Sequence, residues 1–234
     1  LGTRIASVHN GSALFTGDAG GGESDIRKHI IENDYLEAII ALPKDLFYNT
    51  GIGTYIWVMT NRKPTHKKGK IQLINATGNE FFIKMTKSLG SKRNEIKDVG
   101  IQKIYELFDQ FQETEYSKIF DNEDFGYAQI IVERPKRDES WAIIMKKWKP
   151  EPDAELRDKE NIPLKEGIQA YFEREVLPFA PDAWISDKER KVWYEINFNK
   201  YFYEYTPPRS LEDITRDILA LEAETDGVLK EIIS

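Results

Sequence analysis

The residues best suited to hold a ligand lie in a short loop, Pro43–Gly51, between two apolar segments. This loop carries two adjacent aromatic residues, Phe47 and Tyr48, followed by Asn49 and Thr50. Aromatic rings and small polar groups on a loop between buried strands make a partly apolar surface of the kind at which ligands bind. The loop therefore predicts a binding surface, although its composition alone does not say what is bound.

The other motif-like patterns do not describe a catalytic site. Residues 17–24 have the glycine and serine spacing of a phosphate-binding loop, but Glu23 stands where that loop needs a lysine, and a carboxylate there repels phosphate. Residues 51–53 form a bare Gly-x-Gly with no helix after it. The three histidines lie far apart, and no acidic pair suggests an acid–base couple. We therefore predict neither a metal site nor catalytic residues in this chain.

Composition favours a soluble protein of a reducing compartment, and we expect it in the cytoplasm, away from membranes. The 234 residues include no cysteine, no apolar run of membrane-spanning length and no signal-peptide pattern at the start. The formal charge of −7 does not suggest a nucleic-acid binder. Residues 62–97, however, hold ten Lys or Arg against two acids, a balance of +8 that leaves about −15 elsewhere. This basic segment, with Lys67, Lys68, Lys92 and Arg93, is either a plain solvated surface or a face that attracts phosphates.

A small α/β layer must position the loop. Three apolar segments read as buried strands: Arg4–Val8, Leu36–Leu42 and Gly53–Met59. Between the first two lies a helix, Ser24–Glu32, for which Ser24 is a plausible N-cap. The order strand, helix, strand, loop, strand is typical of an α/β fold. Further along the chain we expect a strand at Lys70–Asn75, a helix at Ile101–Phe111 and a strand at Gly126–Glu133.

The end of the chain is the most regular part. Ser210 and Asp213 resemble a capping box, with Asp in place of Glu, at the start of a helix. Apolar residues then recur at alternating steps of three and four, with the polar Thr225 in the same register: Leu211, Ile214, Ile218, Leu221, Val228 and Ile232. This coiled-coil-like seam fits either a helix packed on its own domain or a helix that docks on helices of a partner.

Several stretches resemble one family. RIASVHNGSALFTGDAGGGESDIRKHIIENDYLEAIIALPKDLFYNTGIGTYIWVMTN is similar to the second half of the methyltransferase core in modification subunits of type I restriction–modification systems, which are adenine-N6 DNA methyltransferases. FDNEDFGYAQIIVERP and the ending from PLKEGIQAYFEREVLPFAPDAWI to YEINFNKYFYEYTPPRSLEDITRDILALEAE are also similar to this family. The resemblance covers nearly the whole chain, and LPKDLFYNTGI is its most specific part.

The resemblance implies an enzyme that flips an adenine out of duplex DNA and methylates its exocyclic amine with S-adenosylmethionine. It also implies two partners besides DNA: a specificity subunit that reads the sequence and a restriction (translocase) subunit. The family's glycine-containing cofactor turn and its Asn-Pro-Pro-aromatic loop are absent from this chain. We therefore expect the chain by itself to be inactive and to bind the cofactor weakly.

The resemblance gives each candidate residue a role. Phe47, Tyr48, Asn49 and Thr50 would lie near the flipped adenine, although Phe47 could instead pack into the core beneath the loop. The four basic residues named above would contact DNA phosphates. The apolar seam would pack on the specificity subunit.

The expected fold is the C-terminal part of a Rossmann-like methyltransferase sheet (residues 1–62), an α+β extension (63–209) and a coiled-coil-like interaction helix (210–234). The alternative function is a non-catalytic module that binds DNA or a partner.

Overall fold

The computed structural model describes the whole chain except residues 1, 188–189, 204, 206 and 234, and, within the last helix, the side chains of residues 222 and 225–233. The chain forms two compact units, residues 1–202 and 203–234. In the part of the chain that is described, no helix has the length and apolar character needed to cross a bilayer.

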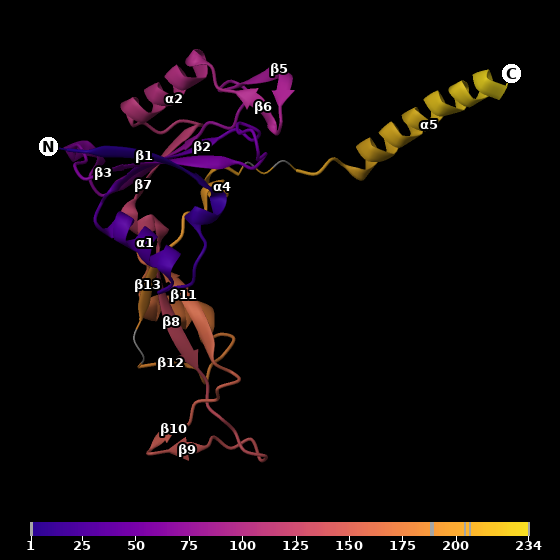
Figure 1. Ribbon diagram of the computed structural model, residues 1–234. Helices are drawn as coiled ribbons and strands as arrows, with labels where there is room; N and C mark the ends of the chain where they lie inside the picture. The colour runs from indigo at the N-terminus through magenta and orange to yellow at the C-terminus, as the bar shows by residue number, and fades with distance from the viewer. Residues whose placement is uncertain (1, 188–189, 204, 206, 234) are drawn as a thin grey trace. The chain divides into compact units, whose positions relative to one another are not determined.

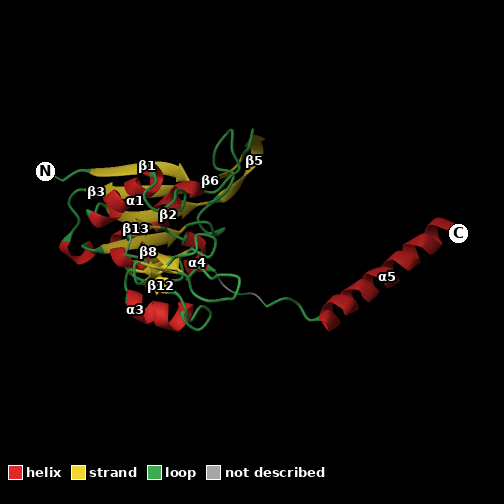
Figure 2. Ribbon diagram, turned by 90° about the horizontal axis from the view of Figure 1, so that it is seen from below, coloured by secondary structure: helices red, strands yellow, loops and turns green. Residues whose placement is uncertain are grey.

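The first unit is built on a five-stranded sheet (Figures 1 and 2). Its strands are β1 (Arg4–Asn10), β2 (Leu36–Leu42), β3 (Thr54–Thr60), β4 (Lys70–Asn75) and β7 (Ser117–Asp121), in the spatial order β1-β3-β2-β4-β7. β2 and β3 pair antiparallel as the sequence predicted, whereas β2 and β4 run parallel. The mixed α/β architecture is therefore confirmed, while the assignment of this sheet to the C-terminal part of a Rossmann-like sheet stays a prediction.

Helices cover both faces of the sheet, which is why the central strand β2 is apolar and fully buried along its length. On one face, Ile31 of α1 (Gly22–Glu32) packs with Trp57 and Leu73. On the other, α2 (Asp98–Gln110) brings Ile104, Leu107 and Phe108 against a second cluster that includes Ile40. The loop of residues 43–51 leaves the end of this buried strand and is thereby anchored to the centre of the sheet.

Two details differ from the sequence-based expectations. β1 is an edge strand rather than a buried one: among the described residues it pairs only with β3, and Ile5 and Val8 are exposed. An apolar strand pattern does not reveal whether both edges of the strand are covered. Helix α1 begins at Gly22 with Gly21 as its N-cap, and Ser24 is buried inside the helix, so Ser24 is not a cap.

The remainder of the first unit is a second sheet and two hairpins. Strand β8 (Gly126–Glu133) pairs with β11 (Asp158–Pro163), β12 (Trp184–Ile185) and β13 (Lys191–Tyr194). The hairpins are β5–β6 (Ile83–Leu89 and Lys92–Glu95) and β9–β10 (Met145–Lys146 and Lys149–Pro150). Short helical segments complete the unit: Gly11–Leu14, Thr65–Lys67, Asn122–Phe125, α3 (Ile168–Tyr171), Phe172–Val176 and α4 (Phe198–Phe202).

The expected boundary at residue 62 does not coincide with a break between compact units. β4 and β7 lie in the same sheet as β1–β3, and Tyr194, Ile196 and Phe198 join the core on the α1 side. The boundary expected near residue 209 lies close to the observed division after Phe202. We therefore treat residues 2–202 as one folded body.

The second unit contains the helix α5 (Leu211–Ile233). Ser210 caps this helix: its Oγ accepts a hydrogen bond from the Asp213 N–H at 3.1 Å and donates one to the Asp213 carboxylate at 2.7 Å. The helix itself was predicted correctly; its coiled-coil character stays a prediction.

Candidate functional site

The loop of residues 43–51 presents its aromatic residues to solvent. Phe47 and Thr50 face each other as an isolated antiparallel bridge, which makes the loop turn sharply. Tyr48 is 63% exposed and Phe47 36% exposed, whereas Leu46 packs against the core on the α2 side of the sheet. The alternative in which Phe47 fills the core is therefore wrong, because Leu46 fills it.

The β5–β6 hairpin holds the loop in place. The Ser91 N–H donates to the Tyr48 carbonyl at 2.8 Å, and the N–H groups of Arg93 and Asn94 donate to the Asp45 carbonyl at 2.9 and 3.1 Å. The Asn94 side-chain amide donates to the Lys44 carbonyl at 2.9 Å. These four hydrogen bonds fix the loop backbone, so its side chains are positioned before any ligand arrives.

Gly90, at the hairpin turn, lets the two backbones approach so closely. Its φ of +63° is a left-handed conformation that glycine adopts readily, and a Cβ there would lie 2.5 Å from the Tyr48 carbonyl oxygen. No residue with a side chain fits without moving the loop. Sequence reasoning missed this hairpin, although the Gly-Ser dipeptide at residues 90–91 between two strand-like segments is a hairpin signal.

The hairpin also brings a predicted phosphate-binding residue close to a predicted base-binding residue. The Lys92 ammonium lies 5.4 Å from the centre of the Tyr48 ring, within range of a cation–π interaction. Arg93, Lys84 and Lys87 belong to the same hairpin and have no ion-pair partner within the described part of the chain. An aromatic ring and a free ammonium thus lie together, on a hairpin that carries three further cations, which suits a ligand with both a flat apolar ring and negative charge.

Asn49 and Thr50 are arranged differently. Asn49 is exposed, whereas Thr50 is half-buried and its hydroxyl accepts the Ile52 N–H at 3.4 Å. Gly51 allows the chain to pass Asp45, whose Oδ1 would lie 2.6 Å from an added Cβ. Beside the loop is an open hollow of about 560 Å³. Its lining comes from the loop and the hairpin: Asp45, Lys84, Met85, Thr86, Ser88, Arg93 and Asn94.

Four of the ten basic residues between 62 and 97 are held by ion pairs. Lys63 pairs with Asp34, Lys67 with Glu37, Lys70 with Asp121 and Lys97 with Glu95. The basic segment is therefore not one uniform surface. Its free positive charge is carried by Arg62, Lys68 and the four cations of the β5–β6 hairpin, as far as the described residues show.

Lys67 is the clearest correction to the predicted phosphate contacts. Its side chain is buried, and its ammonium lies 3.3 Å from the fully buried Glu37 carboxylate and donates to the Phe108 carbonyl at 3.0 Å. Arg4 binds the same carboxylate at 2.9 Å. Lys67 is thus the counter-ion of a buried acid, because an unpaired carboxylate there would be costly. Its neighbour Lys68 is exposed and remains a candidate.

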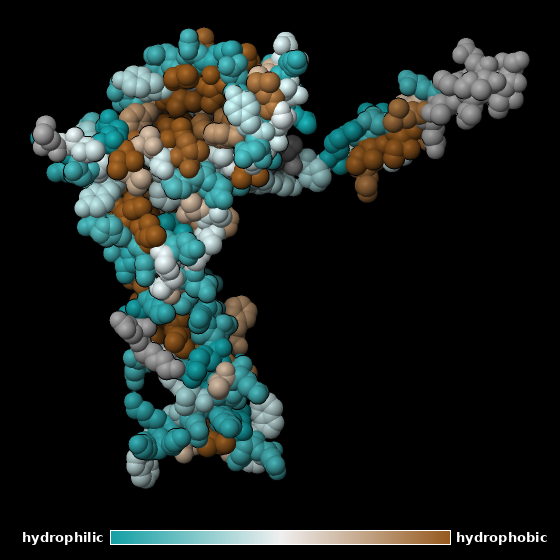
Figure 3. Space-filling view, in the orientation of Figure 1, coloured by the Kyte–Doolittle hydropathy of each residue, from teal (hydrophilic) through white to brown (hydrophobic). Residues whose placement is uncertain are grey.

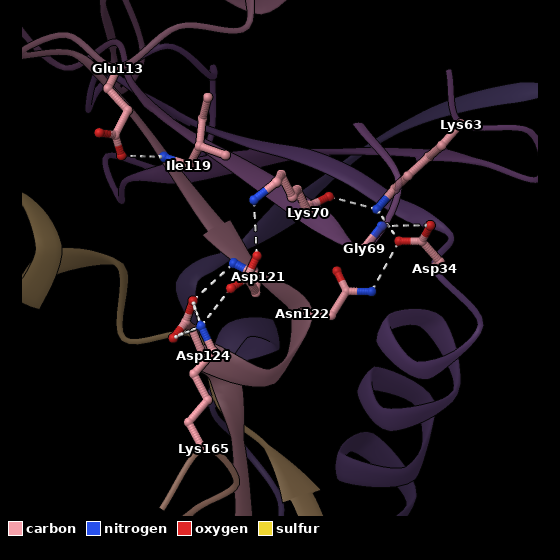
Figure 4. Close-up of polar contacts among 10 residues, drawn as sticks. All are labelled: Asp34, Lys63, Gly69, Lys70, Glu113, Ile119, Asp121, Asn122, Asp124 and Lys165. Carbon is pink, nitrogen blue, oxygen red and sulfur yellow. Dashed lines mark hydrogen bonds and ion pairs between the residues drawn. The ribbon is translucent and has the colours of Figure 1, made fainter. Parts of the chain in front are cut away.

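The connector from β3 to β4 is fixed by Asp34 (Figure 4). The carboxylate of Asp34 accepts hydrogen bonds from the Lys63 ammonium at 2.5 Å, the Gly69 N–H at 3.0 Å and the Asn122 amide at 3.0 Å. Burial raises the pKa of Asp34, but these hydrogen bonds outweigh burial and hold the pKa below its ordinary value. Lys63, in turn, has its pKa lowered by burial. Lys63 therefore stabilises the connector by its bond to Asp34 and is not available to contact a ligand.

Helix α5 exposes the predicted seam. Leu211, Ile218 and Leu221 are exposed, and Ile214 is only slightly less so. Figure 3 shows apolar side chains gathered along one side of the first half of this helix. The side chains of Thr225, Val228 and Ile232 lie outside the described residues. An exposed apolar stripe of this kind suits a helix-packing contact.

A metal site is not apparent among the described residues. No group of three or more His, Asp or Glu suited to a metal ion exists among them. The apolar hollow between α1 and the sheet, lined by Ile26, Ile30 and Trp57 among others, measures about 190 Å³, below the ~300–1,000 Å³ usual for ligand pockets.

Comparison with known proteins gives a consistent result. Residues 2–134 match the family described as N-6 DNA methylase. The methylase subunits of the type I restriction enzymes MjaVII and MjaVIII of Methanocaldococcus jannaschii are 34% and 36% identical over 123 and 118 residues, which is 52% and 50% of this chain. The matched segments cover only 20% and 19% of those relatives. A type I restriction–modification methyltransferase subunit of Streptococcus thermophilus matches with a TM-score of 0.43 and 24% identity, over 52% of this chain and 23% of its own.

Proposed function

The chain belongs to the N-6 DNA methylase family, and we propose that it is part of a type I modification subunit that methylates adenine at N6 in DNA. The observation that carries this proposal is the extent of the family match. Residues 2–134 include the five-stranded sheet, the loop of residues 43–51 and the β5–β6 hairpin that clamps it. The methylase subunits of M. jannaschii match over about a fifth of their length. In this proposal the whole protein, rather than this chain, is the enzyme.

We assign the loop to the target base. Tyr48 is exposed, attached to a backbone held by the hairpin and flanked by the Lys92 ammonium. A base taken out of the DNA stack loses its stacking partners, and an aromatic ring can replace them because every base has a flat apolar face. Tyr48 is the first candidate for this contact, and Phe47 the second. Asn49 and Thr50 supply polar edges beside them.

We assign Lys68, Lys92 and Arg93 to the DNA backbone. All three lie in the matched family region and have no ion-pair partner within the described residues. Contacts from Lys and Arg to phosphate raise affinity for any sequence and fix the orientation of the duplex. Lys92 would thus have two tasks, one on the Tyr48 ring and one on a phosphate near the flipped base.

The methyl group itself would come from S-adenosylmethionine. The family's glycine-containing cofactor turn is absent from this sequence, so in this proposal the cofactor binds to other parts of the whole protein. The described residues bind and orient DNA and the target adenine.

The helix α5 would connect the enzyme with its partners. Its exposed stripe, Leu211, Ile214, Ile218 and Leu221, fits a helix of the specificity subunit, and the restriction subunit would join the same assembly in the cytoplasm. Removing residues 211–234 from the whole protein should abolish co-purification with the specificity subunit. Unchanged co-purification would remove this role from α5.

The reaction is tested on the whole protein with its specificity subunit. Unmethylated plasmid DNA is incubated with S-adenosylmethionine, digested to nucleosides and analysed by mass spectrometry. We expect N6-methyladenine to appear, and no product with the 234-residue chain alone. DNA or partner binding without any methylated base would instead favour the alternative, a non-catalytic interaction module.

A further inference from the structure

A second basic and aromatic surface lies far along the chain from the loop, at the β9–β10 hairpin (residues 145–150). Met145 pairs with Pro150 and Lys146 with Lys149, which leaves Lys147 and Trp148 as a two-residue turn. The Trp148 side chain is 97% exposed. A large aromatic ring that packs on nothing in its own protein is unusual and is a feature typical of contact residues.

The turn has an unfavourable sequence for its shape. Lys147 and Trp148 have φ values of +49° and +66°, the left-handed conformation at both central positions. Hairpin turns of this kind prefer Asn-Gly or similar pairs, because residues with a bulky side chain are strained there. A strained, exposed tryptophan at a turn is an outlier of the sort that often marks a function.

The charge around the ring favours a polyanion. Lys146, Lys147 and Lys149 flank Trp148 in the hairpin sequence, and the only ion pairs made by these lysines among the described residues are long and exposed. Lys146 lies 3.7 Å from Glu151 and Lys149 lies 3.8 Å from Asp187. Such pairs contribute little and exchange readily for a stronger anion. Three lysines in a six-residue hairpin also argue against a protein partner, because lysine is depleted in protein–protein interfaces.

We propose that the β9–β10 hairpin is a second DNA-contacting element. The three ammonium groups bind phosphates on either side of a groove of duplex DNA, and the Trp148 ring enters the groove against the bases. A two-stranded β-ribbon is narrow enough for the major groove, which is about 12 Å wide. The inference rests on the proposed function only in taking DNA as the partner, and it does not depend on methyl transfer or on the loop of residues 43–51.

The test measures binding of the full 234-residue chain to a fluorescein-labelled duplex by anisotropy at several salt concentrations. Replacing Lys146, Lys147 and Lys149 with Gln should lower the slope of log affinity against log salt by roughly 0.9 for each phosphate that is no longer neutralised. Trp148→Ala should weaken binding by about 5-fold or more, the loss typical when a contact tryptophan is truncated at an interface. Trp148→Phe should recover most of that affinity.

Two matched controls separate binding from folding. The double variant Lys147→Asn/Trp148→Gly places a favoured Asn-Gly pair in the turn, so it should unfold at the same or a higher temperature while binding DNA more weakly. Trp141, which is also exposed and has a φ of +65°, lies outside the hairpin, so Trp141→Ala should leave DNA binding unchanged.

The proposal is overturned if the unaltered chain does not bind the duplex at low salt, or if the hairpin variants bind it as the unaltered chain does. Loss of specificity-subunit binding with unchanged DNA binding would make the hairpin a protein contact and also overturn it. None of these three results bears on methyl transfer by the whole protein, which the nucleoside analysis tests separately.

Discussion

Lys67 and Lys68 are adjacent in the sequence but are expected to respond in opposite ways to substitution. Lys67 is buried and neutralises Glu37, while Lys68 is exposed and has no ion-pair partner in the described structure. Lys67→Met should therefore lower the stability of the fold, and Lys68→Met should not. Conversely, Lys68→Met should reduce the salt dependence of DNA binding by roughly 0.9 in slope.

The size of the Lys67 effect follows from its contacts. Removing one partner of a buried ion pair costs ~3–5 kcal/mol. Arg4 still binds Glu37 at 2.9 Å after the substitution, which places the expected loss at the lower end, about 3 kcal/mol. Lys67 also covers the Phe108 ring at 4.1 Å, an interaction that Met partly retains. For a unit of this size, about 3 kcal/mol corresponds to a fall in Tm of roughly 6–12 °C.

The assay is thermal and urea unfolding of the two single variants and of Lys67→Met/Glu37→Leu. Since the double variant leaves no buried carboxylate without its counter-ion, it should lose at least ~1 kcal/mol less than the sum of the two single losses. The reasoning is refuted if Lys67→Met melts within a degree or two of the unaltered chain, or if Lys68→Met is the more damaging change.

Three further outcomes are expected. Gly90→Ala forces a side chain into the Tyr48 carbonyl at a positive φ, so it should cost about 1–2 kcal/mol in urea unfolding; a neutral result would mean that the hairpin does not clamp the loop. The open β1 edge should make the chain self-associate, and replacing Ile5 and Val8 with Lys should lower its mass in light scattering; an unchanged mass distribution contradicts this. The pKa of Asp34 is depressed in the folded state, so the stability that its carboxylate contributes is present above the unfolded pKa of about 3.9 and is lost as pH falls through the folded pKa. Asp34→Asn should therefore make stability less dependent on pH in the acid range. An equally steep loss of stability with acid in both proteins would exclude that role.

The sequence predicted the centre of the sheet well, because strongly apolar segments leave few alternatives. β2, β4 and β8 have the predicted bounds, and the antiparallel pairing of β2 with β3 is confirmed. Edge strands are harder to predict, since the apolar pattern of a strand does not show whether other strands pair with both of its sides. This is why β1 was expected to be buried and is exposed.

Side-chain destinations within the candidate site could be predicted only in part. Composition cannot show that Lys67 is buried and Lys68 is exposed, because the buried Glu37 that forms an ion pair with Lys67 lies 30 residues earlier in the chain. The same limit applies to Leu46 and Phe47, two apolar neighbours of which the turn buries the first and exposes the second. The cation–π pair of Lys92 and Tyr48 depends on a hairpin whose docking is tertiary.

The central claim is that the loop of residues 43–51 forms one wall of the target-base pocket. The rate of methyl transfer by the whole protein in a single turnover tests this claim most directly. Tyr48→Ala should slow transfer to unmethylated DNA by about 5- to 150-fold, because a base would lose its stacking ring, while Tyr48→Phe stays close to the unaltered rate. Unfolding curves of the variants should coincide, since Tyr48 is exposed. Equal transfer rates for Tyr48→Ala and the unaltered protein would contradict the claim.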